Sequence, residues 1–234
     1  MIQLAVIDLA GTLVRDAGAV EGAFADALDA VAVTPDERML DVVRATMGQS
    51  KIDVFRALLG DEQRARTAND AFEAAYERRI AAGETSALPG AVETLHLLRD
   101  GGLKVAVTTG FSAATRESLL HALGWTSLVD ASLSPSGARR GRPAPDLVLA
   151  AVLQLHVDDV RNVAVAGDTT NDLLSGYRAG ASVVAGVLTG AHDRATLETA
   201  PHTHILDSIA ELPGVLDAAQ LPKPSREAAV AATG

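Results

Sequence analysis

The chain alternates short apolar runs with longer segments in which apolar residues recur every three or four positions. The short runs have the length and β-branched content of buried strands, and the longer segments have the period of helices that bury one face. The runs predict strands at Gln3–Asp8, Leu103–Thr108, Val129–Leu133, Val163–Gly167, Ser182–Val187 and Thr203–Leu206. The segments between them predict helices at Ala91–Arg99, Ala113–Leu123, Pro145–Leu155, Asn171–Ala179 and Asp193–Thr199.

This alternation of strands and helices predicts an α/β fold with a doubly wound parallel sheet and helices on both of its faces. In such sheets, ligands bind beyond the carboxyl ends of the strands, near the point where the strand order reverses. Polar side chains that directly follow a strand are therefore the first candidates for a functional site.

One long interval, from about residue 18 to residue 85, carries no strand signal. Its periodicity predicts helices at Val20–Val31, Pro35–Thr46, Ile52–Leu59 and Asp61–Ala81. Thr34 stands three residues before Glu37, a spacing that predicts Thr34 as the N-cap of the second of these helices. We interpret the interval as an α-helical cap domain that is inserted after the first strand and closes over the sheet like a lid.

The predicted organisation therefore has three parts. Residues 1–17 and 86–216 form the core domain, with connections to the insertion near 15–18 and 83–89, and residues 18–85 form the cap domain. The tail, 217–234, has lost apolar periodicity, so we expect it to be flexible.

Composition narrows the range of functions. A chain of 234 residues can bury a sizeable core, and its formal net charge of -10 argues against nucleic acid or an anionic membrane surface as a partner. The absence of cysteine excludes disulfides and thiolate metal sites. No apolar run approaches the ~18 residues of a membrane span, so we expect a soluble, cytoplasmic protein without a membrane partner.

Four segments place polar residues where strands of the predicted sheet end. The candidates are Asp8 in "IDLAGTLV", Thr109 and Gly110 in "VAVTTGF", Arg142 in "GRPAPD", and Asp168 with Asp172 in "VAVAGDTTNDLL". Each segment alone is weak, because an aspartate after a strand is often a helix cap and a Gly-Arg-Pro sequence is often a turn. Their order and common position make the combination more specific.

In this order the four segments resemble the haloacid dehalogenase superfamily over roughly residues 3–216, with the helical interval matching that superfamily's cap domain. The resemblance implies a Rossmann-like core and phosphoryl transfer through an aspartyl-phosphate formed on Asp8. It implies Mg²⁺ held by Asp8, Asp168 and the carbonyl of Ala10, with Asp172 either binding the metal through water or orienting Arg142. The resemblance further assigns phosphoryl contacts to Thr12, Thr109, Gly110 and Arg142.

Position 10 departs from the phosphatases of this superfamily, which carry a second aspartate there as the acid that protonates the leaving oxygen. The sequence "DLAGT" instead resembles the D-x-A-G-T pattern of the phosphonatases, which break a carbon–phosphorus bond. A carbon leaving group needs an electron sink, and a lysine imine formed with a carbonyl substrate supplies one.

The insertion contains a lysine in a matching context. The segment "MGQSKID" at Met47–Asp53 resembles the phosphonatase pattern M-G-x-x-K-I-D, which carries over the imine role to Lys51 and a substrate contact to Met47. Lys51 opens a predicted helix, where the helix dipole and a nearby arginine or metal would disfavour the ammonium form.

Other positions depart from the phosphonatase pattern: Val54 replaces a histidine, Phe111 a tyrosine and Leu13 a threonine. The chain is therefore most similar to the phosphonatase-like hydrolases, a sister group whose substrate need not be phosphonoacetaldehyde. We predict a Mg²⁺-dependent hydrolase that cleaves the carbon–phosphorus bond of a small carbonyl phosphonate. The resemblance also makes a homodimer plausible.

Three alternatives remain open at the level of the sequence. The first is a phosphatase for small phosphate monoesters, which would not depend on Lys51. The second is a haloacid dehalogenase, against which Asp168 and Asp172 argue because dehalogenases need no metal. The third is a binding module without catalysis. We expect substrate choice to depend on pocket walls such as Phe24, Met47, Phe55 and Phe111. We expect Arg139 and Arg140 to form a solvated rim.

Overall fold

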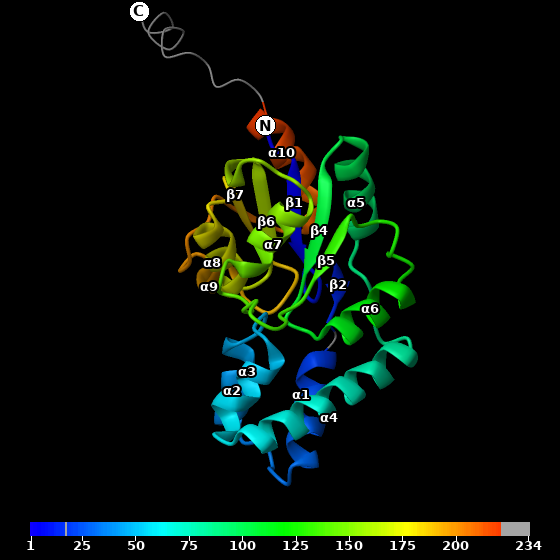
Figure 1. Ribbon diagram of the computed structural model, residues 1–234, viewed down its shortest axis with the longest axis vertical. Helices are drawn as coiled ribbons and strands as arrows, with labels where there is room; N and C mark the ends of the chain where they lie inside the picture. The colour runs from blue at the N-terminus through cyan, green and yellow to red at the C-terminus, as the bar shows by residue number, and fades with distance from the viewer. Residues whose placement is uncertain (17, 221–234) are drawn as a thin grey trace, which may run out of the picture.

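A six-stranded sheet organises the chain in the computed structural model, which describes residues 1–16 and 18–220 (Figure 1). Its strands are β1 (Leu4–Asp8), β4 (Lys104–Thr108), β5 (Ala131–Leu133), β6 (Val163–Gly167), β7 (Val183–Val187) and β8 (His204–Leu206). They lie in the order β5-β4-β1-β6-β7-β8, and every neighbouring pair is parallel. From β1 the chain adds β4 and β5 on one side and then β6, β7 and β8 on the other. The predicted doubly wound sheet is therefore confirmed.

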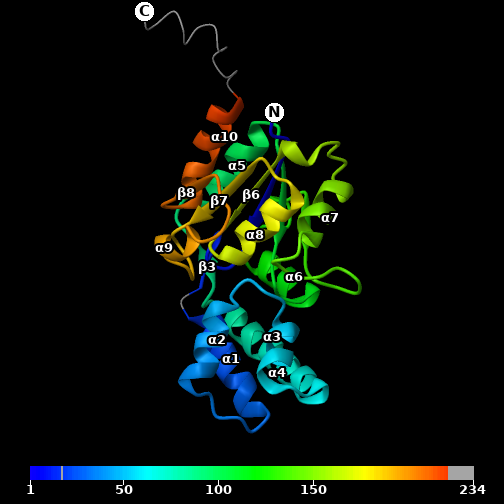
Figure 2. The ribbon, with the colours of Figure 1, turned by 90° about the vertical axis from the view of Figure 1, so that its left-hand side faces the viewer.

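The helices of this part cover both faces of the sheet, because successive strand side chains point to opposite sides. Ala5 and Ile7 of β1 pack in the same cluster as α5, α6 and α10, whereas Leu4 and Val6 pack with α7 and α8 (Figure 2). The helices are α5 (Ala91–Asp100), α6 (Ala113–Ala122), α7 (Asp146–Gln154), α8 (Thr170–Ala179), α9 (Arg194–Leu197) and α10 (Leu212–Gln220), with 3-10 turns at Val160–Asn162 and Ile209–Glu211.

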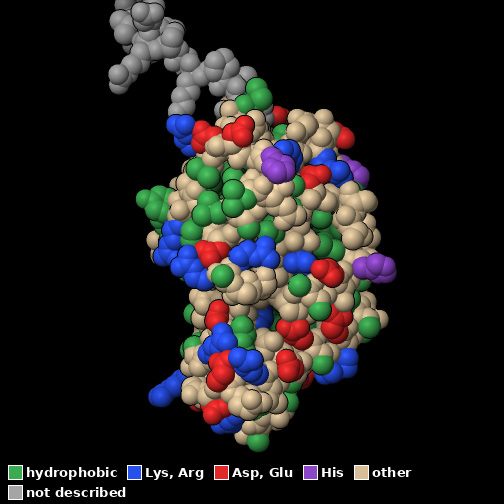
Figure 3. Space-filling model, in the orientation of Figure 1, with side chains coloured by type: hydrophobic (Ala, Val, Ile, Leu, Met, Phe, Trp, Pro, Cys, Tyr) green, Lys and Arg blue, Asp and Glu red, His purple; other side chains and the backbone are tan. Residues whose placement is uncertain are grey.

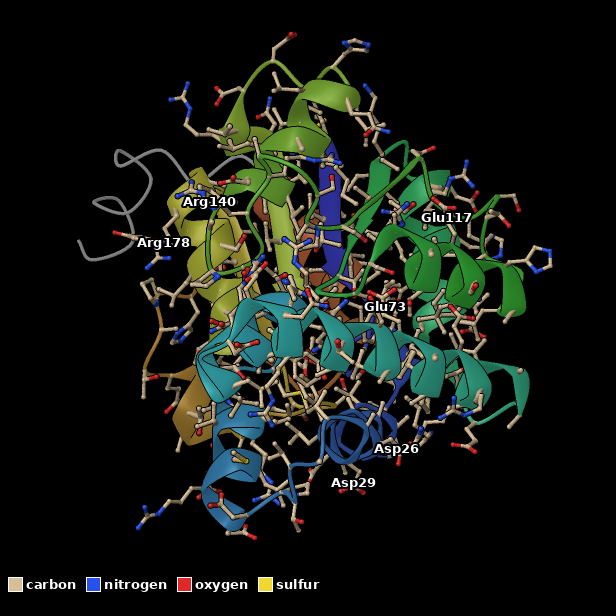
Figure 4. All side chains as sticks on the ribbon, turned by 60° about the horizontal axis from the view of Figure 1, so that its bottom comes forward. Asp26, Asp29, Glu73, Glu117, Arg140 and Arg178 are labelled. Carbon is tan, nitrogen blue, oxygen red and sulfur yellow. The ribbon has the colours of Figure 1, made fainter. Side chains whose placement is uncertain are left out.

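Four further helices lie together beyond the carboxyl ends of the strands (Figures 1 and 2). They are α1 (Ala19–Ala30), α2 (Glu37–Ala45), α3 (Lys51–Leu59) and α4 (Glu62–Ala81), and we call them the helical insertion. Their interior is aromatic: the ring centroid of Phe24 lies 4.8 Å from that of Phe55 and 4.9 Å from that of Phe72. On α1, Asp26 pairs with Arg79 of α4 at 2.9 Å, and Asp29 lies one turn further along the same helix (Figure 4).

The two connections between the insertion and the sheet pair with each other. They form a short antiparallel ribbon of β2 (Val14–Arg15) and β3 (Ser86–Ala87). The sequence does not predict this ribbon, because two residues are too few to show a strand period and the pairing joins positions that are far apart in the chain.

Two predictions about element ends are wrong. Thr34 does not cap α2, which begins at Glu37, because the Asp36 carboxylate accepts the Met39 amide at 2.8 Å and so takes the N-cap position two residues nearer the helix. Residues 217–220 are not part of a flexible tail but continue α10, whereas the rest of the predicted tail, 221–234, lies outside the described residues. Across the described ranges, no helix has both the length and the apolar character of a membrane span.

Candidate active site

The loop after β1 brings Asp8 and Ala10 to the edge of the sheet. Asp8 is buried, and the carbonyl of Leu9 accepts the amides of Thr12, Leu13 and Val14 in a tight turn. Gly11 has a φ of 89°, and a Cβ atom there would lie 2.4 Å from Oδ2 of Asp168. Only glycine therefore lets the loop pass this close to the carboxylate that follows β6.

Asp168 is buried beside Asp8 and held by two donors. Its Oδ1 accepts the Thr12 hydroxyl at 3.3 Å, and its Oδ2 accepts the Ala191 amide at 2.7 Å. Burial, together with the negative charge of Asp8, raises the pKa of Asp168 to about 7. A bound cation would relieve this penalty on the charged form of Asp168.

Arg142 supplies positive charge between two aspartates. One guanidinium nitrogen lies 2.6 Å from Oδ1 of Asp8 and also forms an ion pair with Asp172. Asp172 is itself fixed in a capping box at the start of α8, where it accepts the backbone amide and the hydroxyl of Thr169. This arrangement favours the second of the two predicted roles for Asp172, the orientation of Arg142.

The loop after β4 is in direct contact with the insertion. A Cβ atom on Gly110 would lie 2.1 Å from the carbonyl oxygen of Gln49, and the backbone amide of Lys51 donates to the carbonyl of Gly110 at 3.3 Å. Thr109 precedes this contact, and its hydroxyl accepts the amide of Phe111 at 3.2 Å. The absence of a side chain at position 110 thus allows the start of α3 to rest on the sheet edge.

Other hydrogen bonds join the insertion to the loops of the sheet. Asn171 donates to the carbonyl of Met47 at 2.8 Å and accepts from Gln49 at 3.3 Å. On α4, Glu73 points toward α6 and accepts the Ser112 hydroxyl at 2.6 Å (Figure 4). The insertion is therefore closed against the sheet edge in this structure.

His192 adds a contact on the side of α2. Its Nδ1 accepts the amide of Thr170 at 3.1 Å, and the ring also hydrogen-bonds the backbone of Arg44. Burial lowers the pKa of His192, so the neutral ring that accepts from Thr170 is favoured.

Lys51 projects from the first turn of α3 into apolar surroundings. The side chain is buried, and its Nζ lies 5.5 Å from the ring centroids of Phe24 and Phe111 and 5.9 Å from that of Phe72. No carboxylate of the described residues lies within ion-pair distance of Nζ. Burial, together with the positive charge of Arg142, lowers the pKa of Lys51 to about 8. The neutral amine is therefore much more populated near neutral pH than in an exposed lysine.

A cavity of about 360 Å³ lies between the insertion and the strand ends. The surface is hollowed at the level where these two parts meet (Figure 3). The cavity is lined by Asp8, Ala10, Gly11, Asp16, Gly18, Val20, Glu21, Arg44, Met47, Gly48, Lys51, Thr109, Gly110, Phe111, Arg142, Asp168, Thr169, Thr189, Gly190 and Ala191. Its volume suits a small molecule, and it exposes the Asp8 carboxylate and the Lys51 amine to the same ligand.

Most residues singled out in the sequence line this one cavity, but several do not. Thr12 holds Asp168 with its hydroxyl and does not contribute to the cavity wall, so the structure gives it no direct phosphoryl contact. Phe24 contacts Lys51 from behind the wall, and Phe55 packs against Phe24. Arg140 lies at the periphery, where it pairs with Asp146 at 2.7 Å (Figure 4).

Sequence reasoning missed two residues of this region. Asp16 lines the cavity, and its carboxylate accepts the Val20 amide at 3.0 Å near the start of α1. Phe72 of α4 is the third ring around Lys51. Neither residue stands in a strand-end motif. The apolar stripe of α4 predicts burial of Phe72 but not its partner, because the lysine comes from another helix.

The residues at the sheet edge fit a magnesium ion. Mg²⁺ prefers hard oxygen ligands and is usually held by one or two carboxylates together with water and substrate oxygens. Asp8, Asp168 and the carbonyl of Ala10 meet this requirement, and the raised pKa of Asp168 reflects its burial beside the negative charge of Asp8. The described residues contain no cluster of three or more acidic or histidine ligands, so a bound ion would rely on water and substrate for its other ligands.

The parallel sheet, the carboxylates at its strand ends and the arginine beside them define a doubly wound α/β protein with a charged site at the carboxyl edge of its sheet. The chain belongs to the haloacid dehalogenase-like hydrolase family, whose family model matches residues 2–180. It is similar to a probable phosphatase of Dickeya dadantii, IndB, with 31% identity over 220 residues, 93% of this chain and 95% of the relative. It is also 33% identical over 153 residues to a phosphonoacetaldehyde hydrolase of Bordetella pertussis, an alignment that spans 55% of each chain.

Solved structures share the fold over nearly the whole length. A hydrolase from Pseudomonas syringae superposes with a TM-score of 0.82 at 26% identity, covering 93% of this chain and 99% of the other. A phosphonoacetaldehyde hydrolase-like protein from Oleispira antarctica superposes with a TM-score of 0.81 at 22% identity, covering 93% and 92% of the two chains. The second likeness establishes the fold alone. Together with the family match, these comparisons make the chain an enzyme, a hydrolase of this family.

Proposed function

We propose that this hydrolase cleaves the carbon–phosphorus bond of a small carbonyl phosphonate, such as phosphonoacetaldehyde. The observation that carries the proposal is one cavity that holds the Asp8 carboxylate and a buried Lys51 amine, with alanine at position 10 where an acid would serve an oxygen leaving group. The partial alignment with phosphonoacetaldehyde hydrolases supports the same substrate class.

Lys51 acts first in this proposal. The neutral amine attacks the carbonyl carbon of the substrate, water leaves, and the imine that forms on Lys51 takes up a proton from solvent. Asp8 then attacks phosphorus, the carbon–phosphorus bond breaks, and its electron pair moves toward the imine to give an enamine. Water hydrolyses the aspartyl-phosphate and restores Asp8, and protonation and hydrolysis of the enamine release the aldehyde and restore Lys51.

The remaining groups stabilise charge on the phosphoryl oxygens. Arg142 supplies fixed positive charge beside Asp8, and Thr109 with the Gly110 amide lies on the same cavity wall as donors. Asp8, Asp168 and the Ala10 carbonyl would hold Mg²⁺, which, when bound, neutralises charge between the carboxylates and the substrate. In this proposal the helical insertion is the cap domain, residues 18–85, that excludes water from the cavity.

Release of orthophosphate from phosphonoacetaldehyde in the presence of Mg²⁺ tests the proposal. Lys51→Arg keeps a positive charge but cannot form the imine, so we expect it to lose at least a hundredfold in rate, and borohydride should trap the substrate on the native protein only. Lys104→Arg is the matched control, because Lys104 lies on β4 with its amine on the carbonyl of Leu155. Equal rates for the native protein and Lys51→Arg would remove the imine from the mechanism.

A phosphatase for small phosphate monoesters is the second candidate. It is favoured by the similarity to the probable phosphatase of Dickeya dadantii, which extends over 93% of this chain. In that case a panel of small phosphate esters should release orthophosphate at rates that Lys51→Arg leaves unchanged. The two candidates are therefore separated by the same variant.

A further inference from the structure

Asp16 lies where the chain passes from the sheet into the helical insertion, between β2 and α1. It is half-buried and lines the same cavity as Asp8 and Lys51. Its Oδ1 accepts the Val20 amide at 3.0 Å, which fixes the carboxylate at the start of α1. Its Oδ2 accepts no hydrogen bond from any residue that the structure describes. One carboxylate oxygen is therefore available to a ligand in the cavity.

The other acidic residues of the cavity wall are already engaged. Asp8 forms an ion pair with Arg142, and Glu21 pairs with an arginine of α2 at 3.0 Å. Asp168 accepts two hydrogen bonds and belongs to the proposed magnesium site. Among the described residues that line the cavity, Asp16 is therefore the acidic side chain that has neither an ion pair nor a metal to hold.

Formation of an imine needs proton transfers that the Lys51 amine cannot make alone. After the Lys51 nitrogen has added to the carbonyl carbon, both of its protons must leave, and the former carbonyl oxygen must become water. A carboxylate can take a proton from the nitrogen and give it to the oxygen, so that one group serves as general base and then as general acid. Asp16 has the chemistry and the position in the cavity for this task.

We propose, on the basis of the proposed function, that Asp16 is the catalytic residue that transfers protons while the imine forms on Lys51. The Lys51 nitrogen bonds to the carbonyl carbon, and the Asp16 carboxylate takes one proton from this nitrogen and gives it to the oxygen. A second transfer of the same kind breaks the carbon–oxygen bond, releases water and leaves the carbon–nitrogen double bond. Asp16 ends as the carboxylate that it was at the start. The substrate class is a phosphonate with an aldehyde or ketone group.

The charge of Asp16 also suits the product of this step. Burial is the main cause of the lowered pKa of Lys51, and the negative charge of Asp16 opposes it more strongly than that of Asp8 does. Asp16 therefore favours positive charge on the Lys51 nitrogen, including that of a protonated imine. The two side chains are not in ion-pair contact, so their charged ends are separated within the cavity that both line. A carbonyl group placed between them requires this separation.

Quenched-flow trapping tests the proposal at the imine step itself. The protein with Mg²⁺ would be mixed with phosphonoacetaldehyde and quenched with borohydride at successive times, and intact mass would measure the fraction that carries reduced substrate. The variant is Asp16→Asn, whose side-chain oxygen can still accept the Val20 amide but cannot carry the proton. Asp29→Asn is the matched control, because Asp29 is exposed on α1 and does not line the cavity.

We expect Asp16→Asn to lower the rate constant of adduct formation roughly a hundredfold and Asp29→Asn to leave it unchanged. Calorimetry should show unchanged binding of ethylphosphonate, which has no carbonyl group, to both variants. In Asp16→Ala, added formate should restore part of the rate, because this small carboxylate can occupy the space of the missing one. If Asp16 only caps α1, Asp16→Asn should form the adduct at the native rate and formate should have no effect.

Failure of the proposed function has a different signature. An adduct that forms equally fast in the native protein and in Asp16→Asn would reject the role of Asp16 and leave carbon–phosphorus cleavage through Lys51 standing. If the native protein forms no adduct and releases no orthophosphate from phosphonoacetaldehyde, the proposed function itself is wrong, and the role of Asp16 is rejected with it.

Discussion

The candidate site concentrates buried ionisable side chains that are costly for the fold. Asp8, Lys51, Arg142, Asp168 and Asp172 are each at most 6% exposed. Arg142 forms ion pairs with Asp8 and Asp172, whereas Asp168 relies on two hydrogen-bond donors and Lys51 on aromatic rings. The shifted pKa values of Asp168 and Lys51 are a common signature of a functional site.

Replacement of Lys51 should stabilise the protein. The pKa of Lys51 in the folded state, about 8, lies below its ordinary value of 10.5, so protonation at pH 7 opposes folding. Lys51→Met should therefore raise the free energy of unfolding at pH 7 by about 3 kcal/mol. Between pH 8 and 10.5 the folded protein has released the Lys51 proton while its unfolded chain still binds it, so the stability of the native protein rises with pH. Most of the stability difference between the native protein and Lys51→Met should therefore be gone by pH 10. Urea unfolding at both pH values measures this, and an equal difference at both would contradict the lowered pKa.

The same group should set the pH dependence of the reaction. If neutral Lys51 is required, kcat/KM for phosphonoacetaldehyde should rise about tenfold per pH unit below the pKa of about 8 and level off above it. For a phosphate ester hydrolysed by the same protein, kcat/KM should not show this rise with pH. Initial rates between pH 6 and 9.5 would show it, and a flat profile for the phosphonate would argue against the amine as nucleophile.

At the scale of elements, the N-terminus of α2 depends on Asp36 rather than Thr34. Asp36→Ala removes the acceptor of the Met39 amide and should lower the free energy of unfolding by about 1 kcal/mol. Thr34→Ala is the internal control and should change stability by less than about 0.5 kcal/mol, because Thr34 is exposed and outside the helix. Denaturant unfolding of both variants decides between the two residues, and the opposite ranking would restore Thr34 as the cap.

The contact between α3 and the sheet edge depends on Gly110. A methyl group there would lie 2.1 Å from the carbonyl oxygen of Gln49, so Gly110→Ala should hold the start of α3 away from the cavity. We expect a loss of at least tenfold in kcat/KM, with a smaller change in the unfolding of the sheet. Steady-state kinetics combined with hydrogen exchange at 47–51 would measure both. Ala113→Gly is the control, because it changes a side chain on α6 that lies outside this contact. Gly83→Ala is not a suitable control, because Gly83 has a positive φ that a side chain would strain.

At the scale of the whole molecule, binding of Mg²⁺ should be visible as stability. A ligand at one hundred times its dissociation constant adds about 2.7 kcal/mol to the folded state, which corresponds to several degrees in melting temperature for a chain of this size. The shift should disappear in the presence of a chelator and in Asp168→Asn. The metal-free Asp168→Asn variant should melt above the metal-free native protein near pH 8, because it removes one of two mutually repelling carboxylates. A shift that survives in Asp168→Asn would place the ion elsewhere.

Assembly is a further property of the whole molecule. The resemblance to phosphonatases makes a homodimer plausible, and this stays a prediction that sedimentation at several protein concentrations would check.

The sequence by itself determined the fold class, the helical insertion and the charged residues at the centre of the cavity. Apolar runs at strand period and helical stripes are local signals, and a parallel sheet brings all of its strand ends to one edge. The sequence alone therefore groups Asp8, Thr109 and Asp168. The short β2–β3 ribbon and the cap of α2 were missed because two-residue pairings and competing acceptors leave no periodic signal.

Only the tertiary structure decided how the insertion meets the sheet. Lys51 and the rings around it come from α1, α3, α4 and the loop after β4, and no spacing along the chain reports their proximity. The burial of Lys51 and the absence of a carboxylate partner among its described neighbours both follow from that packing. The physical reason is that the environment of a side chain sets its charge and its hydrogen bonds, and this environment is assembled from distant parts of the chain.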